Sequence, residues 1–142
     1  MSHSDVLLGD VETLRRLRRH RADRAERSLR EAKRAQQTLL AHIEQASDTL
    51  EESRQDEARE SAQLLSHYQG QVMTLQALKT WGAQERVLSA NTRRDKARLE
   101  ALQSQQEEKA IRVGSAQKQV TECLRQVEKL QELSLLLAQE PT

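Results

Sequence analysis

The chain has 142 residues, the length of one ordinary domain. Its 23 basic and 22 acidic side chains nearly cancel, 36% of its residues are hydrophobic and only 1% are aromatic. So few apolar side chains exclude a large globular core, whereas frequent Leu, Gln, Glu, Arg and Ala are typical of long helices and coiled coils. A net charge of +1 argues against a disordered chain held open by self-repulsion.

The first half of the chain is predicted to form one helix over residues 10–68. Asp10 is a suitable N-cap, and no Gly or Pro follows it until Gly70. Apolar and small residues recur at intervals of three and four, the spacing of one helix face. These residues are Ala22, Ala25, Leu29, Ala32, Leu39, Ile43, Ala46 and Leu50.

The second half is predicted to contain a turn at residues 69–73 and a second helix at residues 74–138. Gly70 interrupts the pattern at mid-chain, Thr74 is a suitable cap for a new helix, and Pro141 stops it. The apolar residues of this helix are Leu75, Leu78, Trp81, Leu88, Leu99, Leu102, Val113, Ala116, Val120, Cys123, Val127 and Leu130.

Two amphipathic helices of similar length with a short joint predict an all-α fold. We expect residues 1–142 to form a single antiparallel coiled-coil hairpin. If the turn centres near residue 71, Leu39 faces Leu102 and Ile43 faces Leu99, so the leucine-rich parts of the two helices meet.

The sequence lacks the motifs of a catalytic, nucleotide-binding or metal-binding site. It contains no GxxxxGK, GxGxxG, CxxC or HExxH pattern, and its four histidines are isolated. Cys123 stands alone and has the phase of a small core residue. We therefore expect no enzyme activity, no cofactor and no metal ion.

The N-terminal MSHSDVLLGD lacks the basic and apolar regions of a secretory signal. The longest apolar run, residues 135–138, is far too short to span a bilayer. The sequence therefore predicts a cytoplasmic protein without direct membrane insertion.

Positive charge is concentrated near the N-terminus. Residues 15–34 contain ten Lys or Arg and three acidic residues. Arg15, Arg18, Arg21 and Arg24 recur at intervals of three and are among the arginines with no acidic residue three or four positions later. This excess indicates an acidic surface or a polyanion as partner, and a solvated charged face is the simpler alternative.

Two further groups are candidate contacts. Leu135 and Leu136 cannot both face the first helix, and in a hairpin they lie beside the basic stretch. Tyr68 and Trp81 flank the turn, where they either pack between the helices or anchor an interface.

The segments LRRLRRHRADRAERSLREA and LQALKTWGAQERVL resemble the YscO/HrpO/SctO family of type III secretion proteins, whose flagellar counterpart is FliJ. The resemblance implies a central stalk like the γ subunit of rotary ATPases. Its free ends would enter the pore of a hexameric export ATPase, with the four arginines, Leu135 and Leu136 at that contact. Its turn, with Tyr68 and Trp81, would reach the cytoplasmic ring of the export gate. Secretion chaperones are further partners in this family.

Two other functions stay open from the sequence. One is a generic coiled-coil scaffold or homodimer. The other is a basic-helix nucleic-acid binder, but Asp23, Glu26 and Glu31 interrupt the basic face and no Asn-x-x-Ala-Ala core precedes the heptads. We therefore expect no nucleic acid among the partners.

Overall fold

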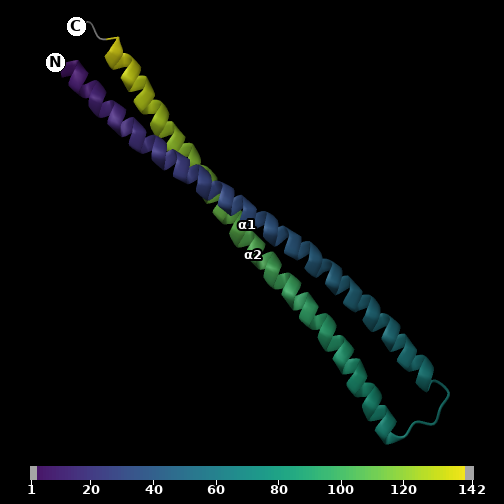
Figure 1. The fold of residues 1–142 in the computed structure, drawn as a ribbon. Helices are drawn as coiled ribbons and strands as arrows, with labels where there is room; N and C mark the ends of the chain where they lie inside the picture. The colour runs from purple at the N-terminus through teal and green to yellow at the C-terminus, as the bar shows by residue number, and fades with distance from the viewer. Residues whose placement is uncertain (1–2, 140–142) are drawn as a thin grey trace. The chain divides into compact units, whose positions relative to one another are not determined.

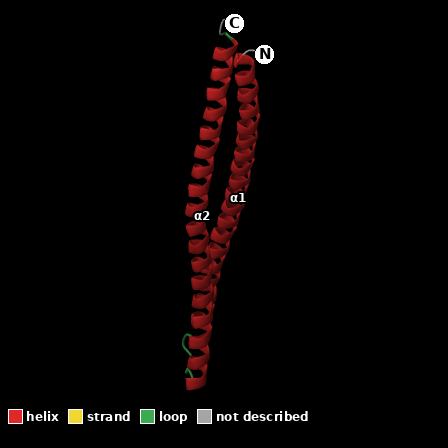
Figure 2. Ribbon diagram, turned by 90° about the vertical axis from the view of Figure 1, so that its left-hand side faces the viewer, coloured by secondary structure: helices red, strands yellow, loops and turns green. Residues whose placement is uncertain are grey.

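The computed structural model describes residues 3–139, which form two long helices joined by a short loop (Figures 1 and 2). Helix α1 spans His3–Tyr68 and helix α2 spans Leu75–Ala138. The fold is the expected all-α helical hairpin. Its contacts define two units, which we call the free-end unit (residues 1–37 and 108–142) and the turn unit (residues 38–107).

Helix α1 begins seven residues earlier than the sequence predicts, so Asp10 lies inside the helix and is not its N-cap. Asp5 places a negative charge in the first turn, where it favours the helix dipole. Gly9 does not stop the helix: its carbonyl accepts a bond from the Thr13 hydroxyl at 3.1 Å. The first turns are helical even though glycine has a low helix propensity.

The loop between the helices is shaped by Gly70 and Thr74. Gly70 has a φ of 76°, a left-handed conformation that suits glycine at the end of a helix. Thr74 caps α2, because its hydroxyl accepts a bond from the Ala77 amide at 3.1 Å. Helix α2 consequently begins at Leu75, one residue later than expected.

In the free-end unit, α1 and α2 run in opposite directions and pack through small and branched side chains. Ala25, Leu29 and Val120 form a buried cluster. The side chains packed against this cluster are Val113, Ala116, Cys123 and Leu124. Small residues at a helix contact allow the two axes to approach closely, and here they face branched partners.

In the turn unit, apolar packing gives way to polar contacts. Leu39, Ala46 and Leu50 of α1 are buried. Nearer the turn, the Ser53 hydroxyl donates to Asp95 and the Ser61 hydroxyl donates to Glu85. These partners lie four to six residues, or between one and two helical turns, further along α2 than a register centred on residue 71 gives.

Leu29 offers a direct test of the packing in the free-end unit. Because it is only 9% exposed, we expect Leu29→Ala to lower the free energy of unfolding by about 2 kcal/mol. The matched control is Ile111→Ala, whose side chain is 72% exposed and should change stability by less than about 0.5 kcal/mol. Urea unfolding followed by circular dichroism measures both, and equal effects would contradict this packing.

Candidate protein-binding surfaces

The four arginines expected to form one basic surface are divided by the structure into an inner pair and an outer pair. The inner pair, Arg15 and Arg18, is half-buried beside α2. A guanidinium nitrogen of Arg15 lies 3.7 Å from the Glu12 carboxylate, and one of Arg18 donates to the Gln126 carbonyl oxygen at 3.3 Å. Arg18 therefore helps to join the two helices, whereas the ion pair of Arg15 lies within α1.

The outer pair, Arg21 and Arg24, is exposed and borders a shallow recess of about 280 Å³ beside Cys123. Within residues 3–139, no carboxylate lies within ion-pair distance of either guanidinium. Their positive charges are consequently available to a partner, and a guanidinium binds carboxylates in a two-pronged geometry that a lysine cannot copy.

Exposed leucines continue this surface along α1. Leu14 and Leu17 are 45% and 54% exposed. With Arg21 and Arg24 they follow intervals of three, four and three, so all four side chains share one face of the helix. Leu7, 38% exposed, lies on the same face seven residues before Leu14. We call this set of five residues the outer stripe.

The end of α2 adds two leucines on the side of the outer stripe. Gln126 and Arg21 line one recess. Leu133 and Leu136 follow Gln126 after seven and ten residues, which keeps them on the same side of α2. They are 43% and 64% exposed. Leu135 is also exposed, but its position in the helix turns it away from this side.

Sequence reasoning missed Leu7, Leu14, Leu17 and Leu133. The sequence held a signal for the first three. Each lies one residue before an inward-facing position of α1, so its side chain cannot join the contact with α2. The same phase explains why Arg21 and Arg24 are exposed whereas Arg15 and Arg18 are half-buried. An interval of three residues alone does not say which members of a series face the neighbouring helix.

The two aromatic residues near the turn contact each other across the helices. The rings of Tyr68 and Trp81 stack with centroids 5.5 Å apart, and His67 meets Tyr68 edge-on at 4.9 Å. The indole nitrogen of Trp81 donates to Glu85 at 3.0 Å, and Ser61 donates to the same carboxylate oxygen at 2.9 Å. Both rings thus join α1 to α2 beside the turn.

A family model described as type III secretion protein YscO matches residues 11–141. The chain belongs to the YscO family of type III secretion proteins. This match confirms the resemblance of the two arginine- and tryptophan-containing segments, and it includes both helices of the hairpin. Searches of curated proteins and of solved structures found no match.

The described part of this YscO-family chain offers no cluster of three His, Cys, Asp or Glu side chains placed to hold a metal ion. Neither helix, over the described residues, is long and apolar enough to cross a membrane. The expectation that the protein is not an enzyme stays a prediction. Because the family is part of the secretion apparatus, the exposed surfaces are the candidate sites of contact with other proteins.

The stacking of Tyr68 on Trp81 can be tested by fluorescence, because the chain has one tryptophan. Removing the stacked ring in Tyr68→Ala exposes the indole to water, so its emission should move to longer wavelength. Leu65→Ala is the control, since Leu65 is near the turn and 54% exposed. An emission maximum unchanged by Tyr68→Ala would show that the two rings do not pack in solution.

Proposed function

We propose that this protein is the central stalk of a type III protein export apparatus. Its free ends insert into the pore of the hexameric export ATPase, and its turn links the ATPase to the cytoplasmic ring of the export gate. The YscO-family match carries the secretion role. The ATPase and gate contacts are our inference from the exposed side chains at each end.

The outer stripe and the exposed end of α2 supply the ATPase contact in this proposal. Arg21 and Arg24 would pair with acidic loops that line the pore, while Leu17 and Leu136 would bury apolar surface beside them. Arg18 acts indirectly, because its bond to the backbone carbonyl of Gln126 holds α1 against α2, while Arg15 pairs with Glu12 within α1. Leu135, on another side of α2, would meet a different part of the pore wall.

The turn supplies the gate contact. We infer that the Tyr68–Trp81 stack fixes the conformation in which the gate ring binds this end of the hairpin. Val72, Leu75 and Leu78 provide exposed apolar atoms around it. Aromatic and apolar side chains of this kind are the usual anchors of protein interfaces.

The remaining parts of the proposal follow from a stalk role. The protein works in the cytoplasm at the inner face of the secretion apparatus, has no catalytic step of its own, and acts on the ATPase through contact alone. Secretion chaperones are a further class of partner.

Reversing the charge of the outer pair tests the ATPase contact. We expect Arg21→Glu/Arg24→Glu to weaken ATPase binding at least tenfold and abolish stimulation of ATP hydrolysis, because two desolvated charge pairs contribute about 1 kcal/mol each or more. Binding of the unchanged protein should also weaken with added salt.

The matched control is Arg93→Glu/Arg94→Glu, a double reversal of exposed arginines in the turn unit. It should leave ATPase stimulation unchanged, and circular dichroism should show both variants helical. If the outer-pair variant stimulates the ATPase normally while the unchanged protein shifts duplex DNA at physiological salt, the arginines bind a polyanion and the proposed contact is wrong.

A further inference from the structure

The inward-facing spacing of α1 changes shortly before the turn. From Val11 to Ser53 the buried and half-buried positions that face α2 alternate between intervals of four and three residues. From Ser53 onward they fall at Glu57, Ser61, Leu64 and Tyr68, so two intervals of four come in succession. An extra interval of four locally unwinds a coiled coil, because the stripe then drifts around the helix.

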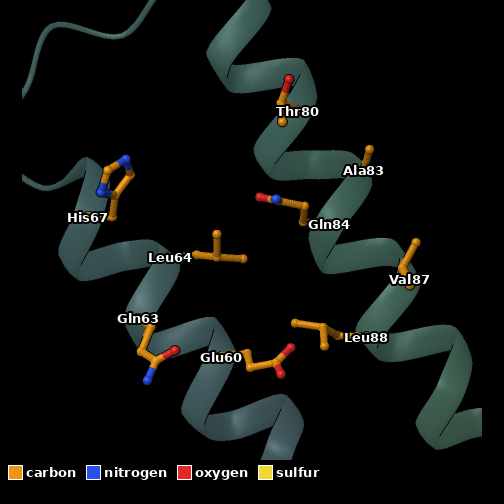
Figure 3. Close-up of a pocket in the computed structure, with 9 residues that line it drawn as sticks. All are labelled: Glu60, Gln63, Leu64, His67, Thr80, Ala83, Gln84, Val87 and Leu88. Atoms are coloured by element: carbon orange, nitrogen blue, oxygen red, sulfur yellow. The ribbon is translucent and has the colours of Figure 1, made fainter.

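Because the inward-facing stripe of α1 drifts around the helix, the two helices do not close over one side, and a groove remains there. Ser61 and Tyr68 contact Glu85 and Trp81 of α2. Glu60, one position before Ser61, lines a groove of about 810 Å³, and its carboxylate points toward α2 (Figure 3). Its lining residues are Glu60, Gln63, Leu64, His67, Thr80, Ala83, Gln84, Val87 and Leu88.

Figure 3 shows how the walls of this groove are built. Leu64 from α1 points toward α2, and Leu88 and Gln84 from α2 point back toward α1, with open space between them. Thr80, Ala83 and Val87 lie along the flank of α2. Each wall covers about two helical turns, roughly 12 Å. The groove is therefore shaped to hold an elongated segment along the two helices.

The charge of the two walls indicates which kind of partner could fill the groove. The α2 wall carries no charged side chain although 32% of the chain is charged, and Val87 is 59% exposed. On the α1 side, Glu60 ends a segment, residues 48–60, with six acidic residues and two arginines. Apolar side chains beside an acidic one favour a partner with an apolar stripe and basic flanks.

We propose that this groove binds an amphipathic helix of another protein, with an apolar stripe bordered by Lys or Arg. The incoming helix would pack its apolar side chains against Leu64, Val87 and Leu88 and place a basic residue near Glu60. This is the helix-in-groove mode of recognition, in which residues at i, i+3, i+4 and i+7 anchor the ligand. The proposal does not depend on the stalk function, since neither the ATPase nor the gate enters it.

The test uses the full chain and a labelled synthetic peptide of about 18 residues, with a leucine stripe flanked by lysines. Fluorescence anisotropy should show saturable binding by the unchanged protein. Val87→Lys should weaken binding about tenfold or more, because it replaces apolar contact with like charge. Glu60→Gln should weaken binding less and reduce its dependence on salt.

The matched control is Leu65→Lys, which adds the same charge at a similarly exposed residue outside the groove lining. Its affinity should stay within about twofold of the unchanged protein. A peptide with glutamates in place of the lysines should not bind.

Equal weakening by Val87→Lys and Leu65→Lys would show attraction to net charge alone and overturn the proposal, as would absence of binding. A protein that is dimeric in light scattering and becomes monomeric with Val87→Lys would also overturn it, because a second copy would then occupy the groove.

Discussion

Packing of one narrow stripe of α1 against one narrow stripe of α2 is the interaction on which the rest of this molecule depends. A pair of helices has no third layer, so each helix can bury only the side chains that recur at intervals of three and four. Among the described residues the buried set is small, and Ala22, Ala25 and Ala46 belong to it beside leucines and valines. Side chains one position away from the stripe, such as Leu14 and Leu17, are consequently exposed, and this phase decides which surfaces a partner can reach.

Polar residues occupy part of this stripe, and their contacts explain both the weakness and the specificity of the packing. Arg18 bonds a carbonyl of α2 in the free-end unit, while Ser53 and Ser61 bond carboxylates of α2 in the turn unit. Polar groups at inward positions of a coiled coil cost stability but favour one alignment of the helices. Glu85 accepts bonds from both Ser61 and Trp81, so beside the turn it too favours one alignment of the helices at a cost in stability.

The helical hairpin could be predicted from the sequence because its signals are local: regular spacing, Gly70 at the bend and Thr74 at the cap. The start of α1 could not, since Asp10 is a good cap that the helix does not need. The division of the arginines also escaped prediction. Whether Arg18 faces α2 or solvent depends on the phase of both helices together, and a change of spacing near Ser61 opens a groove that no motif marks.

The most direct measurement for the stalk account is site-specific photo-crosslinking in the assembled secretion apparatus. A photoreactive residue would replace Leu17, on the outer stripe of the free-end unit, or Leu65, an equally exposed leucine of the turn unit. The account predicts an adduct with the export ATPase from position 17 and none from position 65. Adducts with the ATPase from position 65 and none from position 17 would contradict it.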